Sequence, residues 1–525
     1  MSLSLVWGDW LPLRTFDLAL VIRPPTFQLH CLMDASFALL LIVGYFALLM
    51  LISYLTGREA NEQTFFTANR SSPWYVVAFG MIGASLSGVT FISVPGAVGN
   101  GQWAYLQMVM GYLVGYAVIA FILMPLYYRL RLTSIYGYLD QRFGPHAYLS
   151  GSVLFLISRV IGASLRLYLV ALVIQLAVSD AYNIPFPLTV LISIGLIYLY
   201  TFRGGIKTVV WTDTLQTAAM LIGAGITVWV IAQNLGWDLG ELIATVGQSD
   251  YAETFVWDWA PGDNFFKQFL SGAGIATVMT GLDQDMMQKN LTIRTLGEAQ
   301  RNVLLFSVIL VAANLLFLTL GAMLYLYGEA QGLIDPVFVE GCAIRLADGS
   351  CLATDELFPY LALNHLGPVA ALVFVLGVIA AAYSSADSAL TALTTAFCVD
   401  ILKFEQREDA AQKRRLRYLV HVGFAFLLLM VILAFHAMND RAVIWAVFKA
   451  AGYTYGPLLG LYAFGLYAKA NVRDRTIPWI CLLAPVLSYL INDLSPRYLG
   501  YEFGFEILVV NGLLTFLGLW AVRIR

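Results

Sequence analysis

Long apolar segments separated by short polar ones run through most of the chain. A helix needs about 20 apolar residues to cross a bilayer, and it must satisfy its backbone polar groups within the segment. By this measure the sequence predicts about 13 helical spans and an all-α, polytopic membrane protein. The expected spans lie near 34–56, 73–100, 103–130, 146–178, 184–202, 206–235, 264–287, 301–328, 367–400, 416–437, 440–467, 476–493 and 504–523.

The composition agrees with an exterior that faces lipid. Of the 525 residues, 60% are hydrophobic and only 12% are charged, whereas soluble domains carry about 25% charged residues. The net charge of -3 is too small to indicate nucleic acid as a partner. The expected environment is therefore the lipid bilayer of the plasma or inner membrane.

The positions of lysine and arginine predict the orientation, because cytoplasmic loops are enriched in both. Basic residues recur in every second connection, from Arg58 and Arg70 near the start to Arg523 at the end. The connections between them are short or acidic. We therefore expect the N-terminus outside and the C-terminus in the cytoplasm. Lys289 belongs to one of the expected inner connections.

One expected outer loop, GCAIRLADGSC, contains two cysteines. Cys342 and Cys351 flank Asp348 and Gly349, a turn pair that would bring two short arms together. A disulfide between them fits an oxidising exterior, and two unpaired thiols are the alternative. Residues 1–33 lack the features of a signal peptide. They are either an extension or the result of an over-long start, with Met33 the real first residue.

The segment 73–100 has the composition of an interrupted helix. Small and hydroxyl residues crowd around Gly83 and Gly88, and Pro95 and Gly96 follow. Inverted-repeat transporters hold solutes and ions at such breaks near the membrane midplane, where backbone groups are free. Close helix packing is the alternative explanation for small residues. Similar residues recur at a similar depth in 264–287, so a counterpart is expected there.

A row of hydroxyl groups with one acid lies in 367–400. Ser384, Asp387, Ser388 and Thr391 follow i, i+3, i+4, i+7 spacing and share one helical face, with Ser385 at its edge. Oxygen ligands of this kind suit a hard cation such as Na⁺. The hydroxyl of a single serine often donates a hydrogen bond to a backbone carbonyl of its own helix instead. That alternative does not account for a row that includes an aspartate.

Of the charged residues in the expected spans, the acids Asp213 and Asp387 are placed deepest, and the span 146–178 contains Arg159 and Arg166. A charge in a span costs at least about 2.5–3.5 kcal/mol on insertion scales, so each should face a cavity or a partner. The acids either handle a cation or proton or accept structural hydrogen bonds. The arginines are i, i+7 and share a face. One binds an anionic substrate bidentately, or they pair with the two acids, or Arg159 snorkels.

These motifs resemble the sodium:solute symporter family, which includes bacterial transporters for proline, galactose and sialic acid. The most specific matches are RGGIKTVVWTDTLQ, DQDMMQKNLTIRTLGEAQ and AAAYSSADSALTALTT, in that order, within a resemblance that covers 34–523. It implies a LeuT-like core of two inverted five-helix repeats near 73–235 and 264–467. One extra helix, 34–56, would precede the repeats, and two, within 476–523, would follow.

The resemblance also implies site residues. The main sodium site of the family falls on the backbone carbonyls or hydroxyls of Gly83, Leu86, Ala381, Ser384 and Ser385. A second sodium site matches Asp213 and Ser388. There, Asp387 stands where a serine is expected, so the site binds sodium more strongly, binds a proton or holds a buried acid pair. Substrate contacts fall on Ser85, Ser87 and Thr90, with Arg159 or Arg166 for a carboxylate.

The sequence thus predicts a Na⁺-coupled symporter of a small organic anion, such as sialic acid or another carboxylate. The segment ASLSGVTFISVPG is most similar to the sialic-acid branch of the family. A proline-like amino acid or a sugar is the alternative solute, and proton coupling through Asp213 and Asp387 is the alternative driving force. Neither a nucleotide-binding loop nor a catalytic constellation is recognisable, so ATP use and enzymatic activity are not expected.

Overall fold

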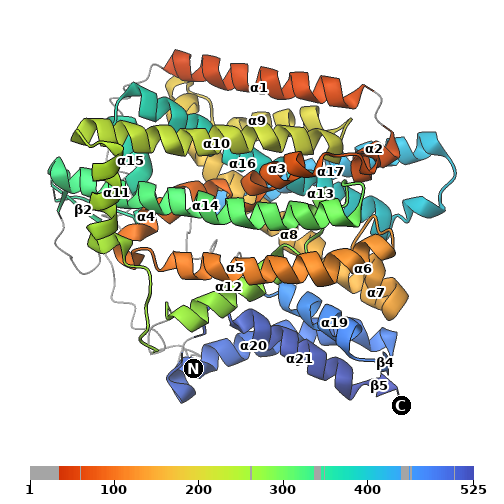
Figure 1. Ribbon diagram of the computed structural model, residues 1–525. Helices are drawn as coiled ribbons and strands as arrows, with labels where there is room; N and C mark the ends of the chain where they lie inside the picture. Colours follow the sequence, from red (N-terminus) through yellow and green to blue (C-terminus); the bar gives the residue numbers. More distant parts are fainter. Residues whose placement is uncertain are drawn as a thin grey trace, which may run out of the picture.

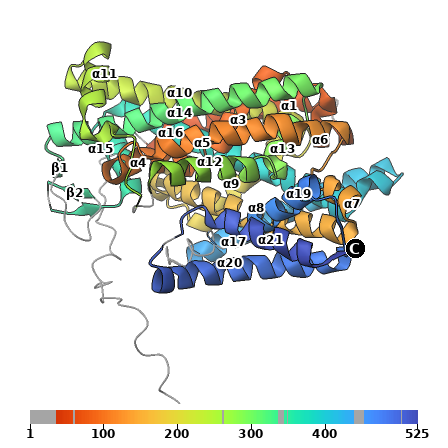
Figure 2. The same cartoon turned by 60° about the horizontal axis from the view of Figure 1, so that its bottom comes forward.

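The computed structural model describes residues 35–58, 61–259, 263–335, 344–347, 349–438, 449, 452–501 and 503–524. Most of these residues form helices that run roughly parallel to one another (Figure 1). Short helices and small sheets cap the two ends of this bundle. Figure 2 shows the strands β1 and β2 at the end opposite to the C-terminus.

Within the described residues, eight helices are long and apolar enough to cross a membrane. They are α1 (Ala35–Gly57), α5 continued into α6 (Tyr105–Val118, Met124–Arg129), α8 (Pro145–Ile174), α10 (Ile206–Leu235), α14 (Leu296–Ala330), α16 (Pro368–Ala396), α17 (Ala410–Met438) and α20 (Ile477–Leu499). The bent pair α3 (Trp74–Ser85) and α4 (Gly88–Gly101) makes a ninth. The predicted multi-pass helical fold is confirmed.

Four other predicted spans correspond to shorter helices. These are α9 (Phe186–Thr201), α12 (Phe265–Met279), α19 (Tyr455–Tyr467) and α21 (Ile507–Ala521). Each has fewer residues than the roughly 20 that a full crossing needs. The count of 13 spans therefore stays a prediction.

Small elements cover both ends of the bundle. The helices are α2 (Glu62–Thr67), α7 (Gly137–Arg142), α11 (Leu239–Gln248) and α15 (Leu357–Asn364), while the short helix α13 (Gln284–Asn290) lies inside the bundle. The strands are β1 (Ile334–Asp335), β2 (Ile344–Leu346) and β3 (Cys351–Leu352), in one antiparallel sheet, and the pair β4 (Asn471–Val472) and β5 (Arg523–Ile524). The expected two arms are present as β2 and β3. Cys342, Asp348 and residues 1–33 lie outside the described residues, so the disulfide stays a prediction.

Two of the helices are interrupted. α3 ends at Ser85, and Ser87 takes the extended conformation (φ -69°, ψ 169°) before α4 begins at Gly88, with a bend of 59° between the two helices. α12 ends at Met279, and the residues 280–283 separate it from α13. The side chain of Asp283 begins α13 by accepting the amide of Asp285 at 2.9 Å. The first break lies where the sequence predicts it, and the second lies near the end of the segment expected as its counterpart.

The connections that carry most basic residues meet at one end of the bundle. The guanidinium of Arg142 donates to the carbonyls of Ala468 at 2.7 Å and Ala470 at 2.9 Å, and Arg70 donates to the carbonyl of Leu132 at 2.9 Å. The strands β4 and β5 and the C-terminus lie at this same end (Figure 1). This clustering agrees with the charge pattern, while the side of the membrane that it faces stays a prediction.

The prediction for Lys289 is wrong. It does not lie in an inner connection but in α13, where every residue is buried, and its own exposure is 1%. The sequence DQDMMQKN has the polarity of a loop. Its charged side chains instead form ion pairs with buried residues, Asp285 with Arg159 and Lys289 with Asp213, so the segment folds as a helix inside the bundle.

Candidate functional site

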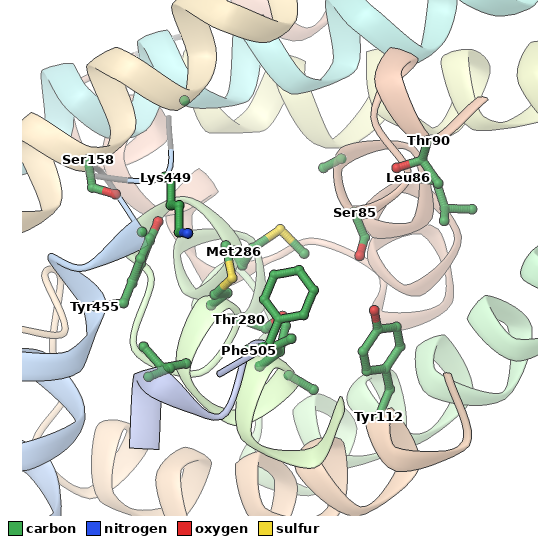
Figure 3. Close-up of a pocket in the computed structure, with 18 of the residues that line it drawn as sticks. Ser85, Leu86, Thr90, Tyr112, Ser158, Thr280, Met286, Lys449, Tyr455 and Phe505 are labelled. Carbon is green, nitrogen blue, oxygen red and sulfur yellow. The ribbon is translucent and has the colours of Figure 1, made fainter. Parts of the chain in front are cut away.

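A cavity of about 630 Å³ lies between the two helix breaks. Ser85 and Leu86 line it from the first break, and Thr280 and Met286 line it from the second. Figure 3 shows the hydroxyl groups of Ser85 and Tyr112 pointing into this space. Ligand sites for small molecules usually measure about 300–1,000 Å³. The cavity therefore has the volume for a small organic solute.

Four of the five predicted substrate residues line the cavity, namely Ser85, Thr90, Arg159 and Arg166. Ser87 is the exception. It is only 5% exposed, precedes the first residue of α4, and has its hydroxyl 3.5 Å from that of Thr90. Ser87 follows the end of α3, so its non-helical backbone takes it off the face on which Ser85 lies, and its hydroxyl faces that of Thr90 instead. The structure brings the other four together, and their binding role stays a prediction.

The two arginines of α8 have different surroundings. Arg159 forms an ion pair with Asp285, and one of its terminal nitrogens lies 3.7 Å from Asp283 Oδ2. Asp283 also accepts a hydrogen bond of 2.8 Å from the hydroxyl of Tyr455. Arg159 is thus paired, but its partners are on or beside α13 and are not the Asp213 or Asp387 considered from the sequence.

Arg166 lines the same cavity and makes no ion pair with any described residue. Lys449 also lines the wall (Figure 3). Because acids balance the charge of Arg159, Arg166 and Lys449 give the described lining of the cavity an excess of positive charge. An arginine without a protein carboxylate can offer its paired N–H groups to a carboxylate of a ligand.

Of the predicted main sodium residues, Gly83 of α3 lies beside Ser384 of α16, and Ser385 lies beside the carbonyl of Ala84. Ser384, Ser385 and Ala381 are at most 1% exposed, and the hydroxyl of Ser385 lies 3.5 Å from the carbonyl oxygen of Ala84. Because α3 ends at Ser85, the carbonyls of its last turn, including that of Gly83, lack the amide partners of a continuing helix. Free carbonyls from α3 and hydroxyls from α16 therefore face each other across a short distance.

Gly83 is required for this close approach. Its amide donates to the hydroxyl of Thr217 at 2.9 Å. A Cβ atom added at position 83 would lie 2.6 Å from Thr217 Oγ1 and 3.0 Å from Ser384 Oγ. Real Cβ atoms essentially never come closer than 3.0 Å to another heavy atom. Only glycine leaves α3, α10 and α16 in contact at this point.

The three residues of the predicted second cation site also lie together. The hydroxyl of Ser388 is 3.3 Å from Asp213 Oδ2 and 3.4 Å from Asp387 Oδ1. Ser384 donates to Asp213 Oδ1 at 2.7 Å. The ammonium of Lys289 is 2.6 Å from Asp213 Oδ2. A cation from the protein itself therefore contacts the acid that the sequence predicts to bind sodium.

Sequence reasoning missed the charged residues at the second break, namely Asp283, Asp285 and Lys289. A signal was present, because Asp283 and Asp285 lie inside the expected span 264–287 and Lys289 follows that span by two residues. Ionisable groups at membrane depth are usually functional or paired. Arg159, on another predicted span, has the charge opposite to that of two of them.

Comparison with known proteins identifies relatives over most of the chain. A model of the sodium:solute symporter family matches residues 65–473. The sodium/sialic acid symporter NanT of Aliivibrio fischeri is 25% identical over 91% of this chain and 93% of its own length. SiaT of Proteus mirabilis, also a sodium/sialic acid symporter, is 24% identical over 93% and 96%. A solved structure of a Na⁺-coupled sialic acid symporter, substrate-bound and outward-open, has a TM-score of 0.76 at 20% identity over 93% of this chain and 97% of that one, which shows a shared fold.

Proposed function

Because the chain belongs to the sodium:solute symporter family, we propose that it couples a sodium gradient to the movement of a small organic anion. The anion is a carboxylate of the sialic acid type. The observation that carries this proposal is a cavity that contains Arg166, unpaired within the described residues, directly beside an oxygen-lined junction of α3 and α16. The two relatives at 24–25% identity are both sodium/sialic acid symporters, which supports the same solute class.

Sodium binds at the junction in this proposal. The carbonyls of Gly83, Leu86 and Ala381 and the hydroxyls of Ser384 and Ser385 supply its oxygen ligands. The contact between Ser385 and the Ala84 carbonyl and the close fit of Gly83 support this placement. A cation held by both helices stabilises their contact and keeps the end of α3, including Ser85, in place beside the cavity. Sodium then raises the affinity for the anion, and the anion must raise the affinity for sodium by the same factor.

The carboxylate of the solute binds to Arg166, and the hydroxyls of Ser85 and Thr90 bind its polar groups. Arg159 has a different role, because Asp285 and Asp283 already neutralise it. Arg159 lines the cavity, and its ion pairs link α8 to α13. The apolar lining, which includes Met279, Met286 and Leu310, accommodates the less polar part of the solute.

The protein is a multi-pass membrane protein, and we place it in the plasma or inner membrane with the C-terminus in the cytoplasm. The gathering of basic connections at the end that contains β4 and β5 supports this orientation. The movement of solute requires no covalent step and no ATP in this proposal.

Uptake into proteoliposomes tests the function. We expect an inward sodium gradient to drive accumulation of N-acetylneuraminate but not of its methyl ester, which is larger by only one methyl group and lacks the negative charge. Proline and galactose represent the alternative solutes, an amino acid and a sugar, and are tested in the same assay. Equal accumulation of the acid and its ester would refute the anion proposal. Uptake that does not depend on sodium and is abolished by an uncoupler would favour the proton-coupled alternative.

A further inference from the structure

We propose that Lys289 is a tethered cation that fills the second cation position at Asp213, so that no sodium ion binds there while the lysine is in place. This inference rests on the proposed sodium coupling and sets the number of sodium ions involved. The observation behind it is the ammonium of Lys289, 2.6 Å from Asp213 Oδ2, with both side chains at most 1% exposed.

The carboxylate of Asp213 has partners on both oxygens. Ser384 donates to Oδ1 at 2.7 Å, and Ser388 and Lys289 contact Oδ2 at 3.3 Å and 2.6 Å. A buried carboxylate needs a counter-charge and hydrogen bonds to offset its lost hydration. Lys289 supplies one positive charge, and the two serines supply the hydrogen bonds. Asp213 therefore has no remaining need for a second cation.

Sodium and a primary ammonium group compete for such a place. Each has one positive charge, and each binds oxygen atoms at short range. A sodium ion on Asp213 Oδ2 would lie next to the Lys289 ammonium in a buried site, where repulsion between like charges is only weakly screened. Occupation by the lysine and occupation by sodium are thus mutually exclusive at this oxygen.

Hydrogen bonds of neighbouring residues in α13 fix the position of Lys289. The amide group of Gln288 donates to the carbonyl of Phe66 at 2.8 Å and to the hydroxyl of Thr395 on α16 at 2.8 Å. Asn302 of α14 donates to the side-chain oxygen of Asn290 at 2.6 Å. These bonds on both sides of position 289 hold α13 against α14 and α16, so the ammonium is directed at Asp213 by the packing of the helix.

Asp387, the acid that stands where the family resemblance implies a serine, has hydroxyl partners on both of its oxygens. The hydroxyl of Tyr200 donates to its Oδ2 at 2.9 Å, Thr212 lies 3.3 Å from the same oxygen, and Ser388 lies 3.4 Å from Oδ1. Hydroxyl groups therefore surround this carboxylate. At Asp213 the geometry supplies the counter-charge from Lys289, without a sodium ion.

A ²²Na⁺ binding assay on the purified full-length protein, which measures the number of sodium ions bound per molecule, tests the inference. Lys289→Gln should bind one sodium ion more than the wild type, because Asp213 then lacks its counter-charge. Lys289→Arg keeps the charge and should bind the wild-type number. Lys469→Gln makes the same chemical change at an exposed position and is the control that should change nothing. An unchanged count in folded Lys289→Gln overturns the inference.

The double variant Asp213→Asn with Lys289→Gln decides the matter even if Lys289→Gln alone does not fold. It removes both charges together and leaves neither unpaired, and we expect it to bind the wild-type number of sodium ions. Loss of one sodium ion in this variant would show that Asp213 binds sodium beside the lysine and would overturn the inference. A wild type that accumulates no solute from a sodium gradient refutes the symport proposal instead, because the binding counts are obtained without transport.

Discussion

Alanine at position 83 should weaken sodium binding strongly while the protein still folds. The added Cβ would lie 2.6 Å from Thr217 Oγ1 and 3.0 Å from Ser384 Oγ, and it would disturb the 2.9 Å bond from the Gly83 amide to Thr217. To relieve these contacts, both α10 and α16 must move away from α3, and the movement of α16 opens the junction. Sodium binding then has to restore the original approach against the crowded methyl group.

The magnitude follows from the cost of overpacking, which is typically about 1–3 kcal/mol for an added methyl group in a close-packed site. If this cost falls on the sodium-bound state, the sodium concentration for half-maximal uptake rises by about 5- to 150-fold, since about 1.4 kcal/mol corresponds to a factor of ten. Thr217→Ala in the Gly83→Ala background removes the closest clashing oxygen. The double variant should recover part of the sodium affinity.

The assay is initial-rate uptake into proteoliposomes at a series of external sodium concentrations. Gly225→Ala is the matched control, because position 225 is a helical glycine of α10 where an added Cβ meets no atom within 4 Å. We expect the sodium dependence of that control to equal the wild type. If Gly83→Ala reaches half-maximal uptake at the wild-type sodium concentration, the junction is not the sodium site.

Three further predictions use the same preparation. Ser384→Ala combined with Ser385→Ala removes two proposed ligands and should raise half-saturating sodium at least about tenfold, whereas unchanged sodium dependence would exclude these serines. Ser85→Ala should raise the KM for the anion and Ser87→Ala should not, because only Ser85 lines the cavity; equal effects in an uptake titration would contradict this distinction. Arg159→Gln leaves buried acids without their partner and should cost about 3–5 kcal/mol of stability, seen as a lower melting temperature. Arg166→Gln should instead raise the KM with little change in melting temperature, and a common pattern for the two arginines would refute their assigned roles.

The parts of the fold that depend on local pattern could be predicted from the sequence. The apolar segments are long, so their helical spans are recognisable, and the small residues around Gly83 indicate the break before the structure shows it. The i, i+3, i+4, i+7 spacing places Ser384, Asp387 and Ser388 on one face because helical geometry is local. These residues are all buried at the interface that the pattern predicts.

The parts that depend on contacts between distant segments could not be predicted in the same way. Lys289 has the surroundings of a loop residue in the sequence, and only its contact with Asp213 explains why it is buried. The partners of Arg159 likewise come from α13, which the spacing along α8 does not identify. Ser87 differs from Ser85 because two residues of non-helical backbone turn its side chain away from the cavity, a direction that composition does not encode.

In the proposed mechanism, a sodium ion at the junction of α3 and α16 couples its own binding to that of the anion. Calorimetric titration of the purified protein tests it most directly, with N-acetylneuraminate titrated in sodium and in potassium, and sodium titrated with and without the anion. We expect each ligand to tighten the other by one common factor, of the order of 5- to 150-fold, and we expect Ser384→Ala with Ser385→Ala to abolish that factor. An affinity for N-acetylneuraminate that is the same in sodium and in potassium would contradict the account.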